Sequence, residues 1–130
     1  MMKQQIETKR LVLTLQTPAK KTYETYSYSI HRCDSQPAIG TALAVVDRDE
    51  EAVQLTVVIN DECRRQGFGL EAGDALVEEL VLCFPKLEIF AVVPDNSLAA
   101  NAYCRRLGFE WEYSDYLSDK DETQSNFYFM

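Results

Sequence analysis

One stretch constrains the fold of this chain more than any other. It is Arg64-Arg65-Gln66-Gly67-Phe68-Gly69-Leu70, which follows the β-prone segment 54–59. After it, apolar residues recur at the spacing of one helix face as far as Cys83. Glycines at a helix start leave its first N–H groups accessible, and the helix dipole favours negative charge there. The stretch therefore predicts a strand, an anion-binding loop and a helix, in that order.

The segments before this loop predict an antiparallel meander, because only short connections separate them. The four β-prone segments are 10–15, 22–32, 39–46 and 52–59. Pro18 should end the first of them, and a turn is expected at 33–37.

The pattern changes after the loop. A helix over 66–83 leads to a strand over 87–93, and this helical crossover predicts parallel pairing with an earlier strand. A second helix, capped by Asp95, Asn96 or Ser97, should run to about Arg106, with Gly108 just beyond its end. Segments 109–117 and 124–130 form a closing hairpin. The sum is an α/β (α+β) fold: a mixed, mostly antiparallel sheet of about six to seven strands, flanked by two main helices.

The composition narrows the classes of protein. With 130 residues, 46% of them hydrophobic, the chain suffices for one domain over 1–130. It holds no run of about 18 apolar residues and no apolar signal core, so we expect a cytoplasmic protein without a membrane partner. A net charge of −8 disfavours nucleic-acid binding. The four cysteines, Cys33, Cys63, Cys83 and Cys104, include no C-x-x-C pair, so we expect no metal.

Two common phosphate-binding motifs fail at the loop. A Walker loop needs a Gly-Lys pair, which the chain lacks. A dinucleotide fingerprint needs G-x-G-x-x-G, but Gly67, Gly69 and Gly73 are one residue too widely spaced at the last step. The loop also follows an antiparallel meander instead of the first strand of a βαβ unit.

A third motif fits. Arg64-x-x-Gly67-x-Gly69, between a strand and a helix, resembles the acetyl-coenzyme A motif of the GNAT superfamily of N-acetyltransferases. Other matches follow in chain order. Segment 6–13 resembles the opening strand of the ribosomal-protein-acetylating branch, and Gly40 matches the glycine that opens the family's third strand. Segment 96–109 resembles the second conserved helix with its Gly-Phe ending, and segment 126–130 resembles the last strand.

This resemblance implies an acetyl-CoA-dependent N-acetyltransferase in which a primary amine attacks the acetyl group directly. The loop amides would hold the pyrophosphate of acetyl-CoA, and the fourth strand would pair with the pantetheine arm where it splays from the fifth. An amide of that strand would stabilise the developing oxyanion. The residues implied at this donor site are Val57, Val58, Ile59, Arg64, Arg65, Gln66, Gly67, Phe68, Gly69, Leu70 and Asn96.

The implied general acid has two candidates. The family's tyrosine stands four residues before the glycine of Gly-Phe; counting back from Gly108 gives Cys104, whereas counting forward from Asn96 gives Tyr103. Adjacent helical residues point about 100° apart, so we expect only one of them to face the thioester. His31, the only histidine, titrates in the range of a general base, but it lies toward the end of the second strand. We assign no general base.

The chain departs from the family between the first two strands. Family members carry one or two helices there, on the acceptor side, and no helix fits between residues 15 and 22. The acceptor is therefore undetermined, and a second hypothesis stays open: a non-catalytic acyl-CoA-binding module of the same fold. The tyrosine-bearing second strand also suggests a homodimer.

Overall fold

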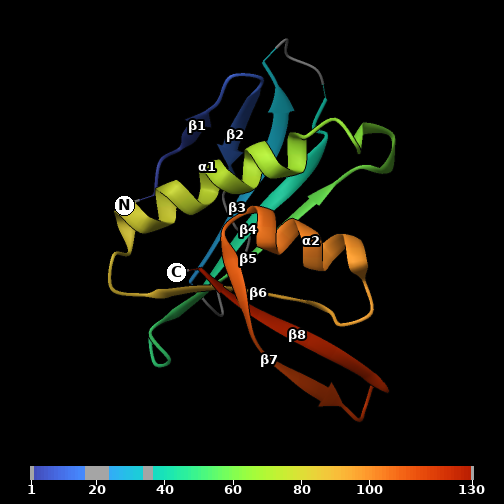
Figure 1. Ribbon diagram of the computed structural model, residues 1–130. Coiled ribbons are helices and arrows are strands. Elements are labelled where there is room, and N and C mark those ends of the chain that lie inside the picture. Colours follow the sequence, from blue (N-terminus) through green and yellow to red (C-terminus); the bar gives the residue numbers. More distant parts are fainter. Residues whose placement is uncertain (1, 17–23, 34–36, 130) are drawn as a thin grey trace.

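The computed structural model describes residues 2–16, 24–33 and 37–129, which contain one eight-stranded sheet. The strands are β1 (Gln5–Glu7), β2 (Leu11–Leu15), β3 (Glu24–Arg32), β4 (Gly40–Asp47), β5 (Ala52–Ile59), β6 (Glu88–Pro94), β7 (Phe109–Leu117) and β8 (Glu122–Phe129). The helices are η1 (Asp61–Cys63, a 3₁₀ turn), α1 (Phe68–Cys83) and α2 (Leu98–Arg106). Both α-helices lie on the same face of the sheet (Figure 1).

The sheet confirms the predicted topology. Its strand order is β1-β2-β3-β4-β5-β6-β8-β7, and β1 to β5 form the antiparallel meander. β6 follows α1 and pairs with β5 in parallel, as the helical crossover predicts. β7 and β8 close the sheet as a hairpin, with a register shift between Trp111 and Tyr113. Within the described residues, no helix is both long enough and apolar enough to cross a lipid bilayer.

The predicted six to seven strands are fewer than the eight observed, and β1 accounts for the difference. Segment 6–13 is not one continuous strand, because the chain turns at Thr8, whose N–H donates to the carbonyl of Leu11 at 2.9 Å. Gln5 then pairs with Thr14 across the hairpin. The polar run Thr8-Lys9-Arg10 interrupts the alternation and makes this turn.

Helix α1 begins at Phe68, two residues later than predicted. Gly67 has φ of 81°, a left-handed conformation that cannot continue a right-handed helix. The expected apolar face is buried, at Phe68, Ala72, Leu76 and Leu80. α2 begins after Ser97, whose side chain accepts a hydrogen bond from the N–H of Ala100 at 3.2 Å and thus caps the helix.

The tyrosines of β3 are not a free surface. Tyr28 is fully buried and its hydroxyl donates to the carbonyl of Lys3 at 2.6 Å. Tyr26 is half-buried, and its ring lies 6.0 Å from that of Phe84. The observation behind the suggested homodimer is therefore wrong, and the homodimer itself stays a prediction.

Some expectations lie outside the described residues: the stop at Pro18, Tyr23 in the second strand, Met130 in the last, and most of the segments 16–21 and 33–37. The absence of an acceptor-side helix after β2 thus stays a prediction, as do the single domain and the cytoplasmic location.

Candidate functional site

The loop between η1 and α1 holds its backbone in an uncommon conformation. Arg65 has φ of 65° and Gly67 has φ of 81°, so two left-handed residues stand just before the helix. Left-handed φ is rare outside glycine and concentrates at functional sites. Alternating left- and right-handed residues point successive N–H groups toward one side, which makes an anion-binding concavity.

The N–H groups of this loop have no acceptor within the described part of the chain. No described residue accepts a hydrogen bond from the amides of Arg65, Gln66, Gly67, Phe68, Gly69 or Leu70. The next amide, of Glu71, already bonds to the carbonyl of Gly67 at 3.0 Å. Unpaired donors at the positive end of a 16-residue helix are suited to a phosphate group.

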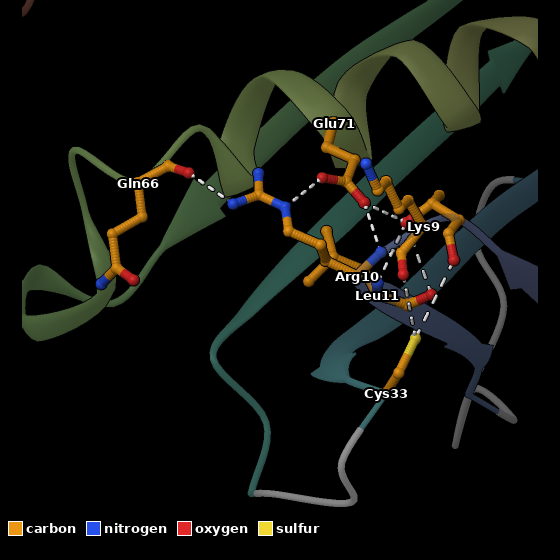
Figure 2. A network of polar contacts seen from close by, with 7 residues as sticks. Lys9, Arg10, Leu11, Cys33, Gln66 and Glu71 are labelled. Carbon is orange, nitrogen blue, oxygen red and sulfur yellow. Dashed lines mark hydrogen bonds and ion pairs between the residues drawn. The ribbon is translucent and has the colours of Figure 1, made fainter.

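The β1–β2 turn fixes the first turn of α1 (Figure 2). Glu71 Oε1 accepts from Arg10 Nε at 2.7 Å, and Glu71 Oε2 accepts from the Arg10 N–H at 2.9 Å and from the Thr8 hydroxyl. Arg10 Nη1 also donates to the carbonyl of Gln66 at 2.8 Å. Burial alone raises the pKa of Glu71, but the hydrogen bonds from Thr8 and Arg10 together outweigh it and lower the pKa. The carboxylate therefore stays charged and holds the loop in place.

The two predicted arginines of the motif behave differently. Arg64 is engaged: its Nε donates to the carbonyl of Ile59 at 2.9 Å, and its Nη1 lies 3.0 Å from Asp61 Oδ1. Arg65 is exposed and forms no ion pair with the described residues. Arg64 thus fastens the loop to the end of β5, while the charge of Arg65 is available to an anion.

A cleft of about 330 Å³ opens where β5 and β6 separate. The two strands pair only from Ala52–Glu88 to Gln54–Phe90, although β5 continues to Ile59 and β6 to Pro94. Beyond Gln54 the edge of β5 that faces β6 has no strand partner, so alternate amides and carbonyls there are available. The lining is mostly aliphatic: Leu55, Thr56, Val57, Arg64, Gly69, Ala91, Val92, Val93, Ala99, Ala100, Tyr103, Cys104 and Leu107.

Tyr103 lies between α2 and the first turn of α1. Its hydroxyl donates to the carbonyl of Gly69 at 2.6 Å. Gly73 makes the approach possible, because a Cβ at that position would lie 2.4 Å from the same hydroxyl oxygen. Burial, followed by the charges of Cys104 and Asp74, raises the pKa of Tyr103. The phenol is therefore protonated at neutral pH and is a potential proton donor.

Cys104 lines the same cleft and is only 1% exposed. Burial raises the pKa of its thiol to about 11, so it is not a thiolate at neutral pH. Sequence counting leads us to expect only one of Tyr103 and Cys104 at the thioester, and the structure places both on the wall of the cleft. Their roles stay a prediction.

The predicted donor-site residues fall into three groups. Val57, Arg64 and Gly69 line the cleft, and Arg65 to Leu70 contribute the free amides beside it. Val58 and Ile59 lie on β5 but do not line the cleft. Asn96 does not line the cleft either: it is exposed, it is not the cap of α2, and it borders a separate surface hollow with Tyr116 and Thr123.

Several site residues could not be found from the motif. Arg10 and Glu71, which fix the loop, are 61 residues apart, and no local spacing connects them. The β6 and α2 residues that line the cleft look like ordinary core positions in the sequence. Neither His31, at the end of β3, nor any described carboxylate lines the cleft. No three described His, Cys, Asp or Glu side chains form a metal-ligand group.

Comparisons with known proteins support the fold. No family model and no curated protein sequence matches the chain. A solved Vibrio cholerae structure, described as a ribosomal-protein-serine acetyltransferase, is 18% identical, with a TM-score of 0.78 and 97% of both chains covered. A Bordetella pertussis structure, described as a GNAT-family acetyltransferase, is 14% identical, with a TM-score of 0.81, and covers 98% of this chain and 100% of its own.

A third solved structure is a microcin C7 self-immunity acetyltransferase in complex with acetyl-CoA and AMP. It is 14% identical to this chain, with a TM-score of 0.69, and the match covers 80% of this chain and 59% of the other. At such identities the likeness establishes the fold, which is that of GNAT acetyltransferases.

Proposed function

We propose that this protein is an acetyl-CoA-dependent N-acetyltransferase that transfers an acetyl group to a primary amine within a ternary complex. The observation that carries the proposal is the junction of two features. Six amides at the start of α1 lack an acceptor among the described residues, and the mostly aliphatic cleft between β5 and β6 begins beside them at Gly69. An acyl thioester that carries a pyrophosphate at the far end of a flexible arm fits both features.

The chain's residues suggest how the donor is held and polarised. The amides of residues 65–70 bind the pyrophosphate, and the unpaired edge of β5 beyond Gln54 pairs with the amide groups of the pantetheine arm. An N–H from this edge, at 55–57, donates to the thioester carbonyl and stabilises the oxyanion that develops when the amine attacks. No covalent enzyme intermediate is needed.

Tyr103 is our choice for the general acid. When the carbon–sulfur bond breaks, the leaving thiolate takes the phenol proton, and the amine proton leaves to water or a base. Burial keeps this phenol protonated. Cys104 is the second candidate, but its thiol is 1% exposed, whereas Tyr103 is half-buried.

A thiol-release assay with acetyl-CoA and a panel of primary amines tests this function. We expect Tyr103→Phe to lower kcat about 10²–10⁴-fold, the scale of general acid catalysis, with a smaller change in KM for acetyl-CoA. Cys104→Ala should change kcat less than about tenfold, because it removes no proton donor in this scheme. The reverse ranking would assign the acid role to Cys104, and activity unchanged in both variants would contradict either assignment.

One observation favours a second candidate function, a non-catalytic acyl-CoA-binding module. Among the described residues that line the cleft, none is a carboxylate or a histidine, so no side chain there is suited to deprotonate an ammonium group. Calorimetric binding of acetyl-CoA without turnover of any amine in the panel, from pH 6 to 9, would favour this module. The absence of binding would contradict both functions.

A further inference from the structure

A second cavity, of about 310 Å³, lies beside the start of α1 and has no part in the scheme above. It is lined by Arg10, Arg32, Cys33, Gln66 and Phe68. Gln66 and Phe68 belong to the loop whose amides are free, so the cavity adjoins the proposed pyrophosphate site. Phe68 connects the two, since its amide is one of the six free donors and its ring is part of the cavity.

Two guanidinium groups meet at the Phe68 ring. The Cζ atom of Arg10 lies 4.5 Å from the ring centroid, and that of Arg32 lies 5.2 Å from it. Glu71 neutralises Arg10 at 2.7 Å. Arg32 has no such partner, because no described carboxylate lies within ion-pair distance of it. Counting only residues that the structure describes, one positive charge at this cavity is therefore uncompensated.

Arg32 also carries an unsatisfied donor. Its Nε atom is buried and finds no hydrogen-bond partner among the described residues. A buried N–H on a charged group without an acceptor is costly, and such a group calls for an explanation. Arg65, which is exposed and has no ion pair with a described residue, adds a second cation at the same end of α1. These charges stand out in a chain whose net charge is −8.

We propose that this cavity binds the 3′-phosphate of coenzyme A, with the Arg32 guanidinium as its principal ligand. The inference rests on the proposed function and deepens it, because it assigns the nucleotide end of the donor. A phosphate monoester supplies the negative charge that Arg32 lacks among the described residues, and guanidinium groups bind phosphate oxygens in a bidentate geometry. The stacked Phe68 ring orients the guanidinium.

The experiment compares coenzyme A with 3′-dephospho-coenzyme A, which differ only in this phosphate. Calorimetry on the wild-type chain should show coenzyme A bound about 10- to 100-fold more tightly, the scale of a charge-assisted hydrogen bond. Arg32→Gln should weaken the binding of coenzyme A by that factor and leave the affinity for 3′-dephospho-coenzyme A unchanged. The ratio of the two dissociation constants should then approach one. Arg32→Lys keeps the positive charge but loses the bidentate geometry of the guanidinium. It should retain part of the discrimination between the two ligands.

The control is Arg48→Gln. Arg48 lies in the β4–β5 turn, where it pairs with Glu24 and its guanidinium lies over the Phe84 ring. Its replacement should leave both affinities unchanged. If wild type binds the two ligands equally, or if Arg32→Gln weakens both by the same factor, the assignment of the 3′-phosphate is contradicted while the pyrophosphate site stands. If wild type binds neither ligand, the proposed function fails, and this inference fails with it.

Discussion

At the scale of single residues, small side chains decide where the candidate acid lies. Tyr103 reaches the carbonyl of Gly69 only because Gly73 leaves room for its hydroxyl. A Cβ at Gly73 would lie 2.4 Å from that hydroxyl and 2.9 Å from Leu107 Cδ2, whereas at Gly69 it would meet nothing closer than 3.4 Å. Two glycine positions four residues apart in one helix therefore differ in how well they tolerate a larger side chain.

This difference gives a matched pair of variants. We expect Gly73→Ala to lower the free energy of unfolding by about 1–3 kcal/mol, the cost of overpacking, and to lower kcat because Tyr103 is displaced. Gly69→Ala should change stability by less than about 1 kcal/mol, because alanine fits there and favours the helix. Urea denaturation together with the thiol-release assay measures both effects. Equal stability and equal kcat in the two variants would contradict the role given to Gly73.

Sequence reasoning at this scale succeeded where chemistry is local. Gly67 and Gly69, at the start of a helix just past a strand, predicted exposed amides, and the six amides have no acceptor among the described residues. That they bind an anion stays a prediction. It did not place Tyr103 against Gly69, because that contact joins residues 34 positions apart. The expectation for Asn96 rested on the resemblance; in the structure Asn96 does not line the cleft, and Ser97 caps α2 in its place.

At the scale of elements, the β1–β2 turn and the first turn of α1 behave as one unit. Glu71 joins them through Thr8 and Arg10, and Arg10 continues to the carbonyl of Gln66 (Figure 2). The anion-binding loop is thereby held by a turn that lies more than 50 residues earlier in the chain. Periodicity predicted both elements, but not their connection, because ion pairs between distant segments leave no local pattern.

The connection predicts a pH dependence. The pKa of Glu71 is lower in the folded chain than its ordinary value of 4.5. At a pH above 4.5 the ionised carboxylate therefore stabilises the fold, and this contribution is lost as the pH falls through the lower folded pKa. At pH 7 we expect Glu71→Gln to be less stable than wild type by about 1–3 kcal/mol. The difference should shrink progressively as the pH falls below 4.5.

Urea denaturation at pH 7, 5, 4 and 3 follows this difference. Glu78→Gln is the control, because Glu78 is an exposed acid of α1 with no ion pair to the described residues. Its stability should follow that of wild type at every pH. A stability difference between Glu71→Gln and wild type that stays constant from pH 7 to 3 would contradict the assigned network.

At the scale of the whole molecule, the anion-binding loop and the far wall of the cleft come from different parts of one sheet. The meander β1 to β5 and α1 present the anion-binding loop, while β6 and α2 supply the other wall of the cleft. The hairpin β7–β8 extends the sheet beyond β6 (Figure 1). The order of elements and the parallel crossover could be read from strand and helix periods. The divergence of β5 and β6 after Gln54 could not be read, since residues 55–57 and 91–93 are as β-prone as the paired part of the two strands.

The most direct test of the account is an amide NMR titration of ¹⁵N-labelled protein with acetyl-CoA. The account predicts large shifts for the amides of residues 65–70 and 55–57, and unchanged resonances at the β4–β5 turn, residues 48–51. It is contradicted if millimolar acetyl-CoA moves no resonance, or if the shifts lie away from the start of α1 and the edge of β5.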